Sequence, residues 1–101
     1  MSKAPQNLFG KRLREARLKA SIPQDKLGVL IGIDEMSSSA RISRYETGIH
    51  APPFEIAMRL AEALGVPTAY FYCEEEILAQ LLLVLSKKSP DKLYELKSQL
   101  E

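Results

Sequence analysis

Hydrophobic residues recur along most of this 101-residue chain at intervals of three and four positions, the spacing that lines one face of an α-helix. Apolar and polar residues do not alternate over more than a few positions, so the pattern predicts no β-strand. It predicts an all-α protein: five helices in one compact unit, followed by two helices in a C-terminal extension. We place these two parts at residues 1–72 and 73–101.

The first helix is predicted over residues 7–20, because its apolar and basic positions separate onto two faces. Residues 21–23 end it, since the residue before a proline is biased toward extended geometry and Pro23 suits the first turn of a new helix. The predicted inward set is Leu8, Leu13, Ala16 and Leu18, and the outward set is Lys11, Arg12, Arg14 and Lys19.

Glycines and a capping residue bound the next two predicted helices. The second covers residues 23–31 and ends at Gly32, and the third follows an N-cap at Asp34 and ends before Gly48. Their predicted inward residues are Leu27, Leu30, Ile31, Ile42 and Tyr45.

The fourth helix is predicted over residues 54–64, with Gly65 as its stop, and a short fifth helix begins at Pro67. The fourth helix has apolar residues at helical spacing: Ile56, Ala57, Leu60, Ala61 and Leu64. Tyr70 and Phe71 lie on the fifth.

Three glutamates, residues 74–76, are predicted to form the first turn of the sixth helix, where the positive end of the helix dipole favours them. This helix is expected to reach Lys88. Ser89 and Pro90 provide an N-cap and a first helical proline for the seventh helix, which carries Leu93, Leu96 and Leu100.

Length and residue inventory exclude several classes of protein. About 100 residues form one domain, too small for a barrel or dinucleotide-binding enzyme. One cysteine, Cys73, and one histidine, His50, provide no disulfide framework, no cysteine-built zinc site and no histidine cluster. Residues 1–7 lack the apolar stretch of a signal peptide, and the longest apolar run, 77–85, is far below the ~20 residues of a membrane span. We therefore expect a small cytoplasmic protein.

Charge is distributed unequally along the chain. Residues 1–50 carry nine basic and five acidic residues, whereas residues 51–101 carry five basic and eight acidic residues. Such an asymmetry is compatible with one half binding a polyanion. On charge alone, chance clustering on solvated helix faces is the simpler explanation.

Residues 24–48 predict a helix-turn-helix, because two short helices are joined by a glycine-containing turn. The spacing of several residues resembles the Cro/C1-type (XRE) family of bacterial and phage transcriptional regulators. The matching residues are Gln24, Leu27, Gly28, Gly32, Ile33, Ile42, Ser43, Glu46, Gly48 and Pro52. The resemblance covers about residues 7–72 and implies a lambda-repressor-like five-helix DNA-binding domain. The length and the extra C-terminal helices are also similar to the controller proteins of restriction–modification systems.

The sequence departs from the family pattern at two places. Gly28 stands where alanine is usual, which costs roughly 0.5–1 kcal/mol of helix stability. Gly32 and Ile42 are separated by four residues more than usual, and the extra residues fall within 34–39. Four residues are close to one helical turn, so they either lengthen the third helix without rotating its face or form a longer turn.

The face of the third helix turned away from the core carries arginine and serine residues. An arginine can donate two hydrogen bonds to guanine, and serine hydroxyls reach bases or phosphates. The resemblance places Ser39, Ala40 and Arg44 at base-reading positions, and Gln24 at a phosphate. The predicted DNA-binding residues are Gln24, Ser37, Ser38, Ser39, Ala40, Arg41, Ser43, Arg44, Thr47 and His50.

Simpler explanations exist for several of these residues. Arg41 and Arg44 would also serve solubility, and the serines would also suit a capped, flexible turn. Lys11, Arg12 and Arg14 are either phosphate contacts or part of a solvated helix face.

The resemblance further implies an ion pair between Arg17 and Glu46, bridging the first and third helices. If the pair is partly buried, loss of one partner should cost ~3–5 kcal/mol, and if it is exposed, less than about 1 kcal/mol.

The sixth helix is apolar nearly all round, so it must bury more than one face. A chain of this size has little else to cover it, and we expect a second copy to do so. The predicted dimerisation residues are Ile77, Leu78, Leu81, Leu82, Leu85, Leu93 and Leu96. In the alternative arrangement, the seventh helix folds back and covers Leu81, Leu82 and Leu85 within one chain.

No enzyme signature is present: the chain lacks G-x-S-x-G, P-loop and G-x-G-x-x-G motifs and has no second histidine for a catalytic pair. We expect neither a cofactor nor a metal. The sequence predicts a homodimeric regulator that binds a pseudo-palindromic DNA operator and blocks or recruits RNA polymerase. The alternative is an interaction module, such as an antitoxin, that binds a partner protein through its C-terminal helices.

Overall fold

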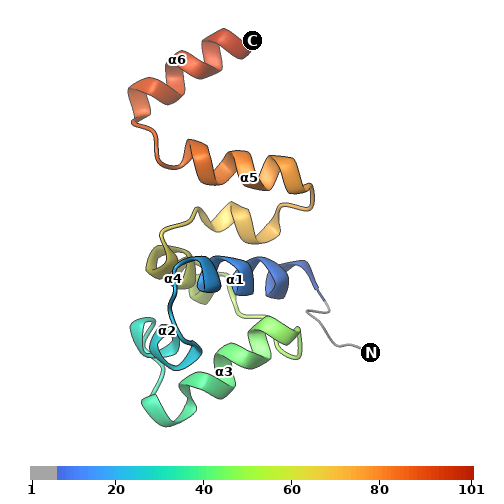
Figure 1. Ribbon diagram of the computed structural model, residues 1–101, viewed down its shortest axis with the longest axis vertical. Helices are drawn as coiled ribbons and strands as arrows, with labels where there is room; N and C mark the ends of the chain where they lie inside the picture. The colour runs from blue at the N-terminus through green and yellow to red at the C-terminus, as the bar shows by residue number, and fades with distance from the viewer. Residues whose placement is uncertain (1–6) are drawn as a thin grey trace.

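The computed structural model describes residues 7–101, and these form six α-helices, one 3-10 helix and no strand (Figure 1). The all-α prediction is confirmed. The expected absence of a leader peptide concerns mainly residues 1–6, which lie outside the described residues. The elements are α1 (Leu8–Lys19), α2 (Gln24–Leu30), α3 (Glu35–Thr47), α4 (Phe54–Leu64), η1 (Thr68–Tyr72), α5 (Glu76–Leu85) and α6 (Pro90–Leu100).

The core lies among α1, α2, α3, α4 and η1, and each of these elements contributes a fully buried side chain: Leu13, Leu27, Ile42, Leu60 and Phe71. α1 lies between α3 on one side and η1 and α5 on the other (Figure 1). Burial of this apolar surface is the main term that stabilises the arrangement. We refer to residues 8–72 as the body.

Three residues of the first two helices lie on a different side from the one predicted. Leu18 and Leu30 are exposed rather than inward, and Arg12 is buried rather than outward. α2 has only seven residues and ends at Leu30. Leu27 and Ile31, four positions apart, lie on the side of this short segment that faces the core, and both are buried. Leu30 then falls on the flank that no other helix covers. The contacts of Arg12 are described below.

The four extra residues lengthen α3 rather than the turn. Asp34 is the N-cap, and its carboxylate accepts a hydrogen bond of 3.0 Å from the backbone N–H of Met36. The helix then runs for 13 residues and ends at Gly48, whose φ of 84° is the left-handed conformation that glycine adopts readily. The second helix of the helix-turn-helix is therefore about one turn longer at its N-terminus.

Close packing against Ser38 explains why residue 28 is a glycine. A Cβ atom placed on it would lie 1.8 Å from Ser38 Oγ and 2.7 Å from Ser38 Cβ, distances that no real contact allows. Ser38 belongs to the lengthened part of α3. The two departures from the family pattern are therefore coupled: the longer α3 places Ser38 in the space that alanine would occupy on α2.

α6 projects away from the body, and none of its residues is buried (Figure 1). The alternative in which the last helix folds back over Leu81, Leu82 and Leu85 is wrong for this structure, because Leu81 remains exposed and the other two are only partly buried. α5 contacts the body through Ala79 and Leu83. No helix among the described residues has the length and apolarity needed to span a membrane.

Candidate nucleic-acid interface

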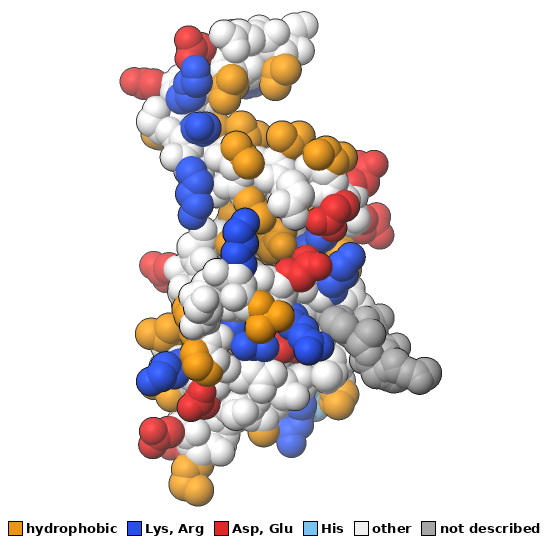
Figure 2. Space-filling view, viewed as in Figure 1, with side chains coloured by type: hydrophobic (Ala, Val, Ile, Leu, Met, Phe, Trp, Pro, Cys, Tyr) orange, Lys and Arg blue, Asp and Glu red, His pale blue; other side chains and the backbone are white. Residues whose placement is uncertain are grey.

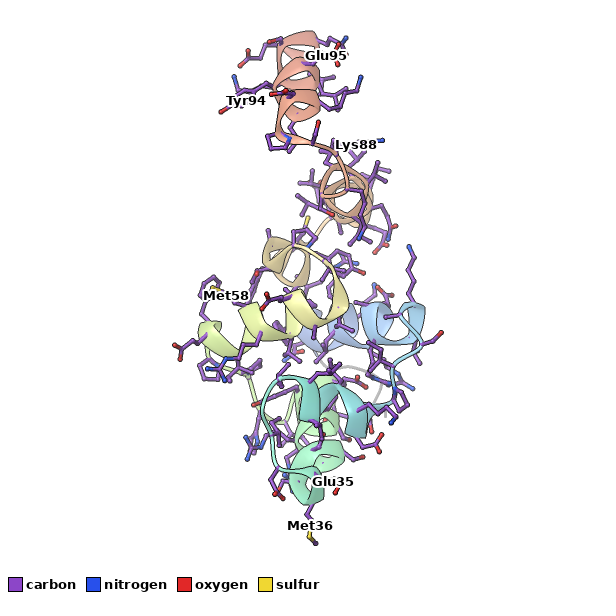
Figure 3. All side chains as sticks on the ribbon, turned by 90° about the vertical axis from the view of Figure 1, so that its left-hand side faces the viewer. Glu35, Met36, Met58, Lys88, Tyr94 and Glu95 are labelled. Carbon is purple, nitrogen blue, oxygen red and sulfur yellow. The ribbon has the colours of Figure 1, made fainter. Side chains whose placement is uncertain are left out.

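One face of α3 is buried against the rest of the body and the other is open to solvent. The buried residues are Ser38, Ile42, Tyr45 and Glu46, and the exposed ones are Glu35, Met36, Ser37, Ser39, Ala40, Arg41 and Arg44. Met36 is 93% exposed and points away from the body at the free end of the helix (Figure 3). Neither Arg41 nor Arg44 forms an ion pair with another described residue, so both guanidinium groups can bind an external acceptor.

Ser38 requires a correction. It is 0% exposed, and its hydroxyl donates a hydrogen bond to the backbone carbonyl of Asp25 in α2. A buried hydroxyl with this partner is not available to a base or a phosphate. Ser38 is thus a packing residue between α2 and α3, not a DNA contact as predicted.

Arg17, Gln24 and Glu46 form one hydrogen-bonded network that fixes α3 relative to α1 and α2. Arg17 donates from Nε and Nη2 to the two carboxylate oxygens of Glu46, with Nη2 to Oε1 at 3.2 Å, and from Nη1 to the carbonyl of Ile22 at 3.1 Å. Both side chains are almost fully buried. A buried pair with several hydrogen bonds holds one geometry, and removal of either partner leaves an uncompensated charge.

Gln24 takes part in this network rather than facing solvent freely. Its Nε2 donates to Glu46 at 3.1 Å, and its Oε1 lies 3.5 Å from the hydroxyl of Ser39. A phosphate contact would have to use the remaining amide N–H. The structure therefore gives Gln24 an internal role in addition to the one that the resemblance implies.

The remaining predicted contact residues lie along α3 and just after it. Ser37 and His50 are exposed, whereas Ser43 and Thr47 are half-buried. The Thr47 hydroxyl donates to the carbonyl of Ser43 at 3.0 Å, so it is partly engaged within its own helix. His50 lies in the loop that follows Gly48, three residues after Thr47.

Arg12 is a buried residue whose contacts were not predicted from the sequence, because the pattern placed Arg12 on the outward face of the first helix. It is 1% exposed, and it donates from Nε (3.1 Å) and Nη2 (2.8 Å) to the carbonyl of Cys73 and from Nη1 (2.7 Å) to Oε1 of Glu76. The one available signal was its position four residues after Leu8 and four before Ala16, which places it on the inward stripe of α1.

The contact between Arg12 and Glu76 shifts the pKa of each group in the direction that favours its charged form. Burial is the largest single influence and lowers the pKa of Arg12. The hydrogen bond and charge of Glu76, together with Tyr70 and Glu15, raise it by more, so the net direction is upward. The pKa of Glu76 is lowered, mainly by the hydrogen bond from Arg12 and then by that from Gln80. Both groups therefore remain charged near neutral pH.

α5 presents an apolar stripe to solvent. Ile77 (72% exposed), Leu78, Leu81 and Val84 lie on its open side, at the spacing of one helix face. Figure 2 shows hydrophobic side chains along the edge of α5 that faces α6 and on the side of α6 that faces α5. Among the predicted dimerisation residues, Leu93 is exposed and Leu82, Leu85 and Leu96 are half-buried.

The described residues contain no group of three or more histidine, cysteine or acidic side chains that could hold a metal ion. The three consecutive glutamates do not converge, and Glu76 alone is engaged by Arg12 and Gln80.

Comparisons with known proteins agree with this arrangement. A family model described as helix-turn-helix matches residues 13–71. Among solved structures, the chain is similar to the transcriptional regulator BswR, with 43% sequence identity, a TM-score of 0.84 and coverage of 90% of each chain. That likeness therefore extends beyond the residues of the family model. No curated protein sequence matches the chain.

Proposed function

Because the chain belongs to the XRE-type helix-turn-helix family of DNA-binding transcriptional regulators, we propose that it acts as a homodimer on a pseudo-palindromic operator. In this proposal it is a regulator of the repressor or controller type, which blocks or recruits RNA polymerase by occupying the operator. Members of this family are generally not enzymes.

The outer face of α3 carries the proposal for DNA recognition. Two exposed arginines without ionic partners among the described residues lie on a helix whose orientation is fixed by a buried network. Arg44 would donate to a guanine in the major groove, and Arg41 would bind a base or a phosphate beside it. The surrounding contacts to DNA would come from the other predicted residues on and just after α3: Ser37, Ser39, Ala40, Ser43, Thr47 and His50.

The apolar stripe of α5 carries the proposal for dimerisation. An exposed row of large aliphatic residues on a small protein is typical of an interaction surface. Continuity with the apolar side of α6 favours a partner that offers the same kind of surface, which a second copy does. A two-fold pair of such chains would place its recognition helices about 34–36 Å apart, one turn of DNA.

The alternative proposal assigns the same stripe to a different protein, as in an antitoxin. Analytical ultracentrifugation of the purified chain separates the two. A dimer that dissociates only on dilution supports the homodimer. A monomer at high concentration, together with co-purification of a neighbouring gene product, supports the alternative.

DNA recognition is tested by fluorescence anisotropy with the region upstream of the gene and with an unrelated duplex. We expect Arg44→Ala to weaken specific binding by about 1–3 kcal/mol and to relax preference at one position. Arg59→Ala, which removes the same charge from α4, is the matched control and should change both duplexes slightly and equally.

Two outcomes would count against this assignment. Equal losses on the specific and unrelated duplexes for Arg44→Ala would make it a phosphate contact. No preference of the unmodified protein for any upstream sequence, at a salt concentration where phosphate contacts alone are weak, would contradict the proposed function itself.

A further inference from the structure

Within the described part of the chain, the polar side-chain contacts between the body and the segment that joins η1 to α5 come from one residue, Arg12. Residues 73 and 74 belong to no helix. Beyond them α5 packs on the body through Ala79 and Leu83, and Lys87 Nζ donates to the carbonyl of Gly65 at 3.0 Å. Arg12 of α1 reaches this segment with a full set of charge-assisted contacts. Arg12 therefore supplies the polar part of the contact that sets the direction of α5, and Ala79 and Leu83 supply the apolar part.

The contacts of Arg12 fix three successive points of the chain. Its Nε and Nη2 both donate to the carbonyl of Cys73, Nη2 also lies 3.4 Å from the carbonyl of Glu74, and Nη1 reaches the carboxylate of Glu76. The guanidinium carbon lies 5.5 Å from the centroid of the Tyr70 ring. A planar guanidinium with several donors can satisfy all of these at once, whereas a lysine ammonium is a single point charge.

α1 links this junction to the recognition helix. Arg17, five residues after Arg12 on the same helix, binds Glu46 of α3 in the buried network described above. The rise of an α-helix separates residues five apart by about 7.5 Å. Two buried arginines on one short rigid helix thus hold α3 and α5 in one relative orientation.

We infer that Arg12 is a positioning residue that sets the spacing between operator half-sites. This inference rests on the proposed function, because it requires a dimer through α5 that binds DNA through α3. Each added base pair moves a half-site by about 3.4 Å and turns it around the duplex axis, so a rigid connection rejects altered spacings and a loose one tolerates them.

The test measures affinity for operators whose central spacer is lengthened or shortened by one or two base pairs. We expect the unmodified full-length chain to lose about tenfold or more in affinity at each altered spacing, a loss comparable to a mismatched base pair. Arg12→Met should reduce that discrimination to about threefold or less, and Arg12→Lys should fall between, because it keeps only the Glu76 ion pair.

Two controls separate positioning from simple destabilisation. Lys11→Met removes the same charge from the neighbouring residue, which also lies near Glu76 (4.0 Å) but is exposed, and should lower all affinities without changing their ratio. Arg12→Met should keep its dimer mass and its affinity for a single half-site. If Arg12→Met does not fold, Glu76→Ala removes one anchor from an exposed position and should produce the same loosening to a smaller degree.

The outcomes distinguish the inference from the function it rests on. If the unmodified chain discriminates strongly between operator spacings and the Arg12 variants discriminate equally well, the inference about Arg12 is wrong and the proposed function stands. An unmodified chain that is monomeric, or that binds no upstream sequence specifically, overturns both.

Discussion

The body buries a core of large apolar residues, whereas α5 leaves many of its own exposed to solvent. In the body, Leu13, Leu27, Ile42, Leu60 and Phe71 are covered by other helices of the same chain. On α5 and α6, residues of the same chemical type, such as Ile77, Leu81 and Leu93, face solvent. The core residues of the body are covered within the chain and these residues of the extension are not, which agrees with the proposed dimer. Mutations should accordingly affect thermal stability in one region and association in the other.

The largest effect is expected in the body. Arg17→Ala leaves the carboxylate of Glu46 buried and without its cation, which should lower the free energy of unfolding by about 3–5 kcal/mol. Thermal denaturation measures the loss. Lys92→Ala, which breaks an exposed ion pair on α6, is the control and should cost less than about 1 kcal/mol. Similar small losses in both variants would contradict the burial of the Arg17 pair.

The extension should respond through association instead. Leu81→Glu places a charge in the apolar stripe of α5, and we expect the dimer to weaken by at least about 2 kcal/mol, or about thirtyfold in its dissociation constant. Sedimentation equilibrium measures this change. Because Leu81 lies outside the buried core, the far-ultraviolet circular dichroism of the body should be unchanged. An unaltered dimer would exclude this stripe as the interface.

A smaller effect tests the packing between α2 and α3. Gly28→Ala drives a methyl group into Ser38, and overpacking of about 1–3 kcal/mol should exceed the gain of about 0.5–1 kcal/mol in helix propensity. Combining it with Ser38→Gly removes the two shortest contacts and leaves the Cα of residue 38 nearest, at 3.0 Å, so the two changes should be non-additive in denaturant unfolding. Additive losses would mean that the two residues do not compete for this space.

The smallest effect concerns the contact that joins the two regions. Since the pKa of Glu76 is lowered in the folded protein, its ion pair with Arg12 contributes stability above the ordinary pKa of about 4.5 and loses it as the pH falls through the lower folded value. The melting temperature of the unmodified chain should exceed that of Glu76→Gln at pH 7 and converge with it under acidic conditions. A difference that grows on acidification would contradict the ion pair.

Local signals explain most of what could be predicted from the sequence. Most helix ends fall close to the expected residues because glycine, proline and capping residues act within a few positions, as Asp34 and Gly48 show for α3. The prediction is less accurate for α5, which spans Glu76–Leu85 rather than residues 74–88 and has only one of the three glutamates in its first turn. The Arg17–Glu46 contact was accessible only through the family resemblance, since 29 residues separate the partners.

What could not be predicted depends on contacts between distant segments. In the sequence, Arg12 has the pattern of a solvated residue, but in the structure it binds a carbonyl 61 positions away. Ser38 looks like a DNA contact until the lengthened α3 brings it against Gly28. In both cases a polar side chain is buried by a partner that no local pattern reveals.

Methylation protection at guanine N7 tests the central claim most directly, because that atom lies in the major groove where α3 is proposed to bind. On the operator bound by the full chain, we predict two clusters of protected guanines about one helical turn apart. In Arg44→Ala, protection should be lost at the guanine that this arginine contacts. Specific binding with every guanine N7 still reactive, or with a single protected cluster, would contradict it.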